Sequence, residues 1–191
     1  MKKIIILCLA IAIPLATFAQ VPVHCLIKTS LGDIAIELYP AKAPNTVANF
    51  MQYVDKKSYN GSSFFRVCTP VNEATRKVKI QVIQGGNVPD SLSLDSIKIE
   101  TTKYTGVLHK NGTLSMARSG PNSATSQFFI CVNDQPALDY GGARNPDGQG
   151  FAAFGKVTAG MAVVKKIQSQ KDTSQYLVKP VKIYGISRVK L

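Results

Sequence analysis

The chain has 191 residues, of which 45% are hydrophobic and 18% charged, so it fits one globular domain and is neither a disordered chain nor a coiled coil. The formal net charge is +12. Because the lysines are spread along the chain in runs no longer than two, this excess indicates a solvated basic surface rather than a nucleic-acid site.

Residues 1–19 have the three-part pattern of a cleavable signal peptide. The segment begins with Lys2 and Lys3, continues with an apolar stretch too short to span a bilayer, and ends in small residues ahead of Gln20. We therefore expect residues 1–19 to be removed and residues 20–191 to form the mature domain. The mature protein would be exported, either periplasmic or secreted, with no stable membrane anchor.

Strand patterns dominate the first half of the mature chain. VHCLIKTS (23–30) and DIAIELYP (33–40) alternate in polarity on either side of a glycine turn, which predicts a β-hairpin. Residues 42–59 repeat apolar side chains at helical spacing, which predicts an amphipathic helix. FFRVC (64–68) and KVKIQVIQGG (77–86) then predict two further strands.

The second half continues with short strands separated by turn residues. GTLSMA (112–117) and SQFFICV (126–132) read as strands, and DYGGARNPDGQG (139–150) as a loop. A strand at 151–157, a second helix at 159–170 and a last strand at 180–191 follow. Many short strands with two moderate helices predict a closed antiparallel barrel with helices at its ends.

No familiar catalytic set is visible in the pattern of titratable residues. His24 and His109 have no partner at metal-ligand or triad spacing, and we interpret both as surface residues. An enzyme with this sequence is expected to work without a metal, a cofactor or a titrating pair.

Three cysteines remain after the expected signal cleavage, so they cannot all pair within the chain. Cys131 lies in the apolar run FFICV and is expected to be a buried small hydrophobe. Cys25 and Cys68 could form a disulfide in an oxidising compartment or stay free, and the sequence leaves both possibilities open.

Three segments together resemble the blocks of the cyclophilin family of peptidyl-prolyl cis/trans isomerases: FFRV (64–67), QVIQGGN (81–87) and GTLSMARSGPNSATSQFFI (112–130). The resemblance continues through PALD, FAAFGKV and GMAVVKKI and spans roughly residues 23–191. It implies a mainly β fold, a closed eight-stranded antiparallel barrel capped by two α-helices. It also implies isomerisation of X-Pro peptide bonds without a cofactor.

The same resemblance implies roles for individual positions. Arg66 matches the catalytic arginine of the family, and Gln84 matches the glutamine that holds the substrate backbone. The other matched positions form the substrate groove, along the peptide or around the proline ring: Ala117, Arg118, Ser119, Val82, Gln127, Phe129, Leu138 and Phe151.

Three positions and one segment depart from the family pattern. Gln81 stands where an aromatic residue is usual, which predicts a thinner or more polar wall of the proline pocket. Ala137 stands where many members have tryptophan, which argues against tight binding of cyclosporin-like ligands, and Phe151 stands where a histidine is common. Thr69–Lys79 is longer than in compact members and is expected to form an inserted loop or extended hairpin beside the groove.

Two other functions remain open beside the isomerase. A cyclophilin fold could bind proline peptides, or act as a chaperone, with little turnover, and the changes at Gln81 and Phe151 motivate this alternative. The basic surface could instead bind polyanions, which an exported location disfavours. The expected partners are proline-containing polypeptides and not nucleic acid, and the expected state is a monomer.

Overall fold

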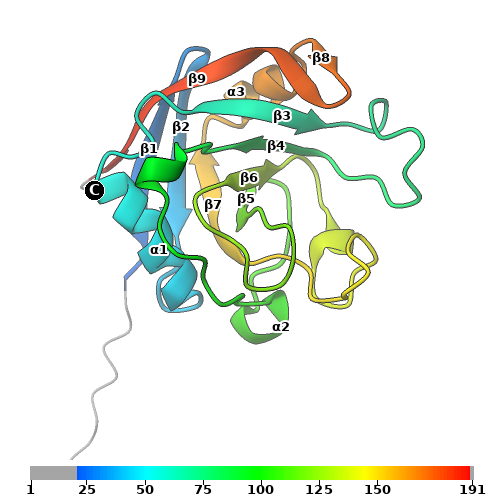
Figure 1. Ribbon diagram of the computed structural model, residues 1–191, viewed down its shortest axis with the longest axis horizontal. Helices are drawn as coiled ribbons and strands as arrows, with labels where there is room; N and C mark the ends of the chain where they lie inside the picture. The colour runs from blue at the N-terminus through cyan, green and yellow to red at the C-terminus, as the bar shows by residue number, and fades with distance from the viewer. Residues whose placement is uncertain (1–20, 190–191) are drawn as a thin grey trace, which may run out of the picture.

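Eight antiparallel strands close into a barrel in this computed structural model, which describes residues 21–189 (Figure 1). The strands follow the ring order β1-β2-β7-β5-β6-β4-β3-β9, and pairing of β1 with β9 closes the ring. A two-residue strand, β8 (Asp172–Thr173), pairs only with β9. The ring strands are β1 (Val23–Thr29), β2 (Gly32–Leu38), β3 (Ser63–Cys68), β4 (Val82–Gly85), β5 (Thr113–Met116), β6 (Phe128–Cys131), β7 (Ala153–Ala159) and β9 (Tyr176–Arg188).

This architecture confirms the predicted fold class of a closed eight-stranded antiparallel barrel. The expected signal peptide at residues 1–19 lies outside the described residues. Within residues 21–189, no helix has both the length and the apolar character that a membrane crossing requires.

The β1–β2 hairpin forms as predicted, and its register explains the alternating sequence. Ile27 pairs with Ile34 and Cys25 with Ile36, and all four side chains are buried. Because successive side chains of a strand point to opposite faces, the residues between these four face outward and are exposed or half-buried. The apolar face of the hairpin therefore belongs to the barrel core.

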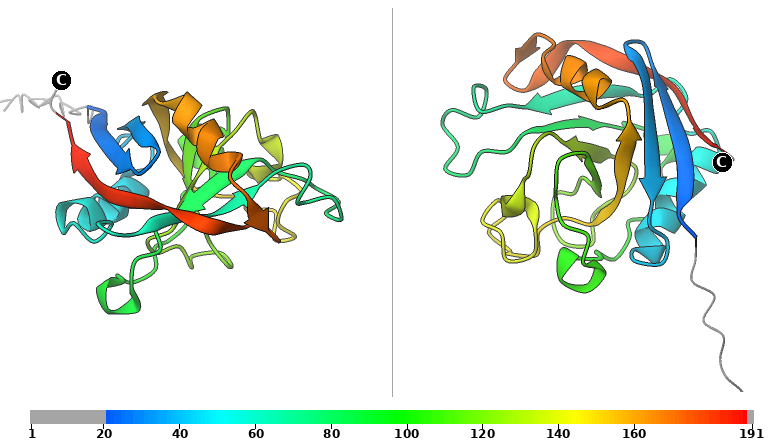
Figure 2. Two further views of the ribbon diagram at one scale, coloured as in Figure 1. Left: turned by 90° about the horizontal axis from the view of Figure 1, so that it is seen from above. Right: turned by 180° about the vertical axis from the view of Figure 1, so that it is seen from behind.

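Two helices pack against the barrel at opposite ends (Figures 1 and 2). Helix α1 (Pro44–Asp55) places Phe50 against the rings of Phe128 on β6 and Phe154 on β7, with centroids 5.4 and 5.2 Å away. Helix α3 (Met161–Gln168) buries Val164 and Ile167 completely and packs against β2, β3 and β4. Both helices were expected, although each is shorter than the pattern suggested.

The described residues also contain single-turn helices, which the sequence pattern did not predict. Helix α2 (Thr102–Thr105) ends where Gly106 takes a left-handed conformation with φ of 66°. Two 3-10 turns, η1 (Asp90–Leu92) and η2 (Pro136–Leu138), lie in other connections. Segments of three or four residues are too short to show a hydrophobic period, so sequence pattern could not identify them.

The inserted segment Thr69–Lys79 forms a loop rather than a hairpin, and it projects beyond the ends of β3 and β4 (Figure 1). The strand predicted over residues 77–86 is consequently confined to β4. The backbone N–H of Ile80 donates to the Glu73 carboxylate (2.8 Å), and that of Gln81 donates to the Gln135 side-chain oxygen (3.1 Å). Side-chain oxygens thus accept hydrogen bonds from backbone N–H groups that would otherwise pair with a neighbouring strand.

Cys25, Cys68 and Cys131 are all free and buried. The possible Cys25–Cys68 disulfide is therefore absent, and the buried character expected for Cys131 is confirmed. Cys25 belongs to the barrel core, whereas Cys68 and Cys131 belong to a second, smaller apolar cluster.

Candidate active site

Three adjacent strands bring the three family-like segments together on one wall of the barrel. Arg66 on β3 pairs with Gln84 on β4, and Gln84 pairs with Phe129 on β6. Directly opposite residues in an antiparallel sheet have Cβ atoms roughly 5 Å apart on the same face. The strand register therefore places a guanidinium, an amide and an aromatic ring in a row, although their sequence positions are far apart.

The two glycines after Gln84 allow close contact between β4 and its neighbours. A Cβ atom on Gly85 would lie 2.7 Å from the Phe64 ring and 2.8 Å from the Ser63 carbonyl oxygen. Gly86 has a φ of 79°, and a Cβ atom there would lie 2.8 Å from the Phe128 ring. Any larger residue would displace the core aromatics, so the glycines fix the position of the strand that carries Gln84.

Arg66 is half-buried and is held by amide oxygens. Its Nη1 donates to Gln84 Oε1 (2.7 Å), while Nε and Nη2 donate to Gln175 Oε1 (3.0 and 2.6 Å). Gln84 in turn donates through Nε2 to Gln127 Oε1 (2.9 Å). Among residues 21–189, no ion pair involves Arg66. The guanidinium is thus oriented by neutral partners, and its positive charge remains uncompensated.

A cavity of about 450 Å³ lies beside Arg66. All ten residues that the family resemblance assigned to the site line it: Arg66, Val82, Gln84, Ala117, Arg118, Ser119, Gln127, Phe129, Leu138 and Phe151. The other lining residues were not marked by any motif: Arg76, Ile80, Ser123, Thr125, Arg144, Asn145 and Pro146.

The apolar end of the cavity is a cluster separate from the barrel core. Ile80, Val82, Phe129 and Leu138 form this cluster with the buried cysteines, and Phe151 packs against it. The rings of Phe129 and Phe151 meet edge to face, with centroids 5.3 Å apart at 90°. Such a surface suits a compact apolar ring, because it offers contact area without a polar group that a ring would leave unpaired.

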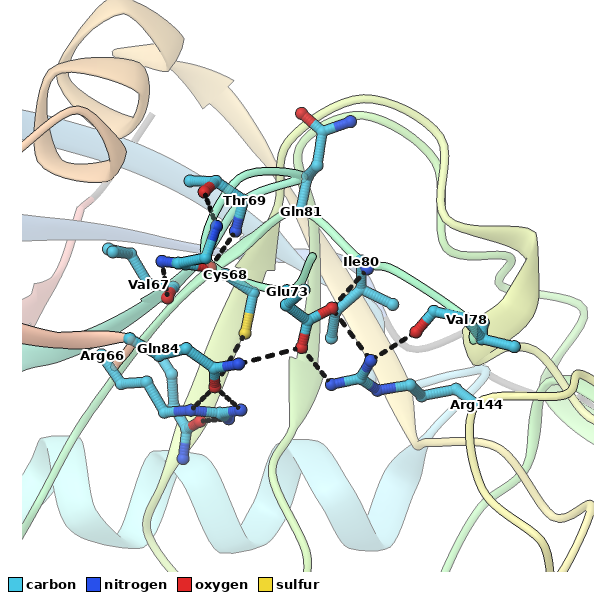
Figure 3. Close-up of polar contacts among 12 residues, drawn as sticks. Arg66, Val67, Cys68, Thr69, Glu73, Val78, Ile80, Gln81, Gln84 and Arg144 are labelled. Carbon is cyan, nitrogen blue, oxygen red and sulfur yellow. Dashed lines mark hydrogen bonds and ion pairs between the residues drawn. The ribbon is translucent and has the colours of Figure 1, made fainter. Parts of the chain in front are cut away.

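Gln81 does not line this cavity, so the prediction of a more polar pocket wall at this position is wrong. Its side-chain oxygen accepts a hydrogen bond from Asn133 Nδ2 (3.3 Å), and in Figure 3 it points away from Arg66. Ile80 lines the cavity in its place and is only 6% exposed. The period-two pattern of VKIQVIQ could have indicated this, because it puts Ile80 on the same face as Val82 and Gln84.

The residues expected along the peptide follow β5 rather than belonging to a strand. Ala117 donates its N–H to the Gln127 carbonyl (2.9 Å), and Ser119 is exposed. The Arg118 side chain is only 2% exposed and makes a bidentate ion pair with Asp147 (2.7 and 2.9 Å). Its guanidinium also donates to the Gly150 carbonyl and lies over the Phe151 ring at 5.1 Å. Arg118 therefore holds the rim of the cavity in place through these contacts. Its positive charge is neutralised by Asp147.

His109 is 1% exposed, so its interpretation as a surface residue was wrong; His24 is half-buried. His109 Nδ1 contacts Asp139 Oδ1 (2.7 Å), and Nε2 contacts Ser115 Oγ (2.9 Å). The order Ser115–His109–Asp139 is that of a catalytic triad, but Ser115 is 0% exposed, so no substrate can reach its hydroxyl group. The His109 ring stacks on Phe129 with centroids 5.9 Å apart, so the three polar residues support the cavity floor.

Besides these lining residues, two residues behind Arg66 were not predicted from the sequence. Gln175 is hydrogen-bonded to Arg66, and Glu73 is hydrogen-bonded to Gln175. Gln175 occupies the β8–β9 turn with a positive φ of 77°, and no motif marked it. Glu73 is the only acidic residue of the inserted loop, which was the sole signal of its importance.

Comparison with known proteins agrees with this geometry. The family model described as "Cyclophilin type peptidyl-prolyl cis-trans isomerase/CLD" matches residues 24–188. A peptidyl-prolyl cis-trans isomerase of Acinetobacter baylyi is 42% identical over 170 residues, which cover 83% of this chain and 81% of the relative. Peptidyl-prolyl cis-trans isomerase B of Escherichia coli is 37% identical over 143 residues, covering 73% of this chain and 80% of the relative.

Solved structures share the fold. A cyclophilin-type peptidyl-prolyl cis-trans isomerase of Cryptosporidium parvum superimposes with a TM-score of 0.72 at 22% identity, covering 90% of this chain and 99% of that chain. A second structure of that protein, determined in the presence of the dipeptide Ala-Pro, gives a TM-score of 0.70 at 22% identity, covering 88% and 99%.

Proposed function

The chain belongs to the cyclophilin-type peptidyl-prolyl cis-trans isomerase family, and from this premise we propose that Arg66 is its catalytic residue and that the adjoining cavity binds the proline of an X-Pro substrate. The observation that carries this proposal is the state of Arg66. Its guanidinium faces the cavity, is fixed by amide oxygens, and makes no ion pair among residues 21–189.

An uncompensated guanidinium is suited to this reaction for an electronic reason. Amide resonance gives the peptide bond a rotation barrier of about 18–20 kcal/mol. Rotation breaks this resonance and leaves a lone pair on the proline nitrogen, which then becomes a hydrogen-bond acceptor. A donor at that nitrogen stabilises the twisted state more than either planar state, which is the condition for catalysis.

The energy that the site must supply is modest. A rate gain of about 10⁵ corresponds to ~7 kcal/mol of differential stabilisation. A charge-assisted hydrogen bond in a partly buried site, together with a fixed substrate, can supply this amount. The apolar cluster of Phe129, Val82, Leu138 and Ile80 would hold the proline ring. Gln84, at 2.7 Å from Arg66, would hold the adjacent substrate carbonyl.

The ligand class has support from a protein of similar fold. A cyclophilin-type isomerase of Cryptosporidium parvum was solved in the presence of Ala-Pro, a dipeptide that ends in proline. The alternative of a binding module without turnover rested partly on a polar wall at Gln81. Because Ile80 forms that wall instead, the geometry favours the isomerase.

The test of this proposal is the cis-to-trans isomerisation rate of short X-Pro peptides with different X residues. We expect the mature protein to accelerate the reaction and Arg66→Ala to lose at least about 100-fold in kcat/KM, because the donor to nitrogen is gone. Arg188→Ala is the matched control, since that arginine is exposed and pairs with Asp55 away from the cavity. A folded protein that accelerates none of the peptides would leave proline-peptide binding as the better description.

We further propose that this isomerase assists the folding of exported proteins as a monomer. Proline isomerisation takes tens to hundreds of seconds and limits the folding of many chains. A catalyst that needs no cofactor suits a compartment outside the cytoplasm. The signal-peptide pattern of residues 1–19 supports this location.

The export proposal predicts a specific cleavage. Full-length protein expressed in a Gram-negative bacterium should be recovered from the periplasmic or extracellular fraction with Gln20 as its first residue. Intact-mass measurement and N-terminal sequencing would establish the cut. Recovery of the uncut chain from the cytoplasm would contradict export.

A further inference from the structure

The inserted loop Thr69–Lys79 delivers one completely buried carboxylate to the site. Glu73 is 0% exposed, and its two oxygens receive four hydrogen bonds. Oε2 accepts from the Ile80 backbone N–H (2.8 Å) and from Arg144 Nη1 (2.9 Å). Oε1 accepts from Arg144 Nη2 (2.5 Å) and from Gln175 Nε2 (3.2 Å). Only an ionised carboxylate has enough acceptor sites for four donors.

The two ends of the Gln175 amide face different partners: its NH₂ group donates to Glu73, and its oxygen faces Arg66. The Gln175 backbone is fixed at both groups, because its N–H donates to Asp172 Oδ1 (2.9 Å) and its carbonyl accepts from the Val67 N–H (2.8 Å). A side-chain amide presents donors on one side and an acceptor on the other. With its NH₂ group directed to the Glu73 carboxylate, the amide oxygen is left to accept both hydrogen bonds from Arg66.

We propose that Glu73 is a positioning residue of the isomerase: through Gln175 it fixes the orientation of the Arg66 guanidinium. The inference rests on the proposed function of Arg66 and assigns a role in it to the inserted loop. Figure 3 shows the Glu73 carboxylate lying between the Arg144 guanidinium and the group of side chains around Arg66. Glu73 makes no hydrogen bond to Arg66 itself, so it acts through the intervening amide.

The arrangement directs Arg66 without neutralising it. A carboxylate in direct contact would hold the guanidinium equally well, but it would compensate the charge that the twisted amide requires. Here Arg144 makes the ion pair with Glu73, and the neutral amide of Gln175 stands between that pair and Arg66. Burial alone would raise the pKa of Glu73. Hydrogen bonds from Arg144 and the Ile80 N–H outweigh it and hold the pKa below its usual value, which keeps the acceptor ionised at neutral pH.

The first test is Glu73→Gln, a change of nearly equal shape. In one orientation of a glutamine, its NH₂ group faces the donors of Gln175 and Arg144 Nη2; in the other, it faces the Ile80 N–H and Arg144 Nη1. Because each orientation leaves two donors without an acceptor, position 73 no longer fixes one direction of the Gln175 amide. We expect kcat for a short X-Pro peptide to fall at least about tenfold, since small misplacements of a catalytic group cost that much. KM should change less than about twofold, because the lining of the apolar cavity is untouched.

A second variant, Gln175→Met, separates positioning from loop stability. It removes the hydrogen-bonded link between Glu73 and Arg66 and leaves the Glu73–Arg144 ion pair in place. A positioning role predicts a loss in kcat similar to that of Glu73→Gln. A role of Glu73 limited to anchoring the loop through Arg144 predicts that Gln175→Met keeps its activity.

The matched control is Asp55→Asn, which breaks a bidentate carboxylate–arginine pair on the surface away from the cavity. It should leave kcat and KM unchanged. Thermal unfolding of each variant establishes that the rates belong to folded protein. If Glu73→Gln does not fold, the loss in kcat of Gln175→Met decides the question.

The outcomes distinguish this inference from the proposed function. If the wild type isomerises peptides and Arg66→Ala does not, while Glu73→Gln or Gln175→Met stays within about twofold of wild type, the positioning role is overturned and the function stands. An inactive wild type instead removes the proposed function on which the inference rests.

Discussion

At the scale of single residues, the site depends on how one arginine is held. Arg118, Arg144 and Arg188 of this chain each pair with a carboxylate. Arg66 instead donates to the side-chain oxygens of Gln84 and Gln175. A neutral acceptor fixes the direction of a guanidinium while leaving its charge available for an electron pair that forms only during rotation.

The buried cysteines give a residue-scale prediction about reactivity. Burial raises the pKa of Cys25 to about 11 and, despite the nearby positive charge of Arg66, the pKa of Cys68 to about 11. Burial likewise raises the pKa of Cys131 far above its usual value. Because the thiolate is the reactive form, mature protein should react with a thiol reagent at pH 8 far more slowly than a free cysteine does.

The measurement is a spectrophotometric thiol titration with and without denaturant. We expect almost no reaction of the native mature protein within minutes, and reaction of all three thiols in guanidinium chloride without a reductant. Rapid native reaction would show that a cysteine is accessible. A deficit of two thiols in denaturant would show that Cys25 and Cys68 had paired after all.

At the scale of elements, helix α1 is the part whose packing is easiest to test. Phe50 is 0% exposed and contacts the rings of Tyr59, Phe128 and Phe154 at centroid distances of 5.2 to 5.4 Å. Phe50→Ala should lower the free energy of unfolding by about 3–5 kcal/mol, since it removes a core aromatic and leaves a cavity.

Urea denaturation followed by circular dichroism measures this change. Tyr104→Ala is the control, because Tyr104 is 81% exposed and its removal should alter stability by no more than about 0.5 kcal/mol. A loss below 1 kcal/mol in Phe50→Ala would contradict the packing of α1 against β6 and β7.

The regular elements followed from sequence pattern, whereas the loops that complete the site did not. Alternating polarity located the β1–β2 hairpin, and helical spacing located α1 and α3. The strand predicted over 77–86 was too long because the Glu73 carboxylate takes the Ile80 N–H, a contact that no local period encodes. His109 was misplaced for a similar reason, since its hydrogen-bond partners Asp139 and Ser115 come from other segments.

The candidate site shows the same division. All ten residues taken from the family resemblance line one cavity, because short motifs specify strand positions and the strand register then brings them together. Gln175 and Glu73 lie in a turn and in an inserted loop, where side chains meet through tertiary contacts alone. Sequence spacing carries no information about such a contact.

At the scale of the whole molecule, the strand that closes the barrel, β9, also reaches the site. β9 pairs with β1 and also with β3, and Arg66 lies opposite Tyr176 at the start of β9. The turn that carries Gln175 is thereby held beside the strand that carries Arg66. The C-terminal strand therefore both closes the fold and supplies a partner of the proposed catalytic arginine.

The most direct test of the account is whether Arg66 acts on rotation rather than on binding. Exchange NMR of an Ala-Pro peptide at saturating and subsaturating concentrations gives kcat and KM separately for the wild type and Arg66→Lys. Lysine keeps the charge but lacks the fixed fork of donors. We predict a kcat at least about tenfold lower with KM nearly unchanged. A kcat equal to that of the wild type, with only KM raised, would contradict the claim that the guanidinium stabilises the twisted peptide bond.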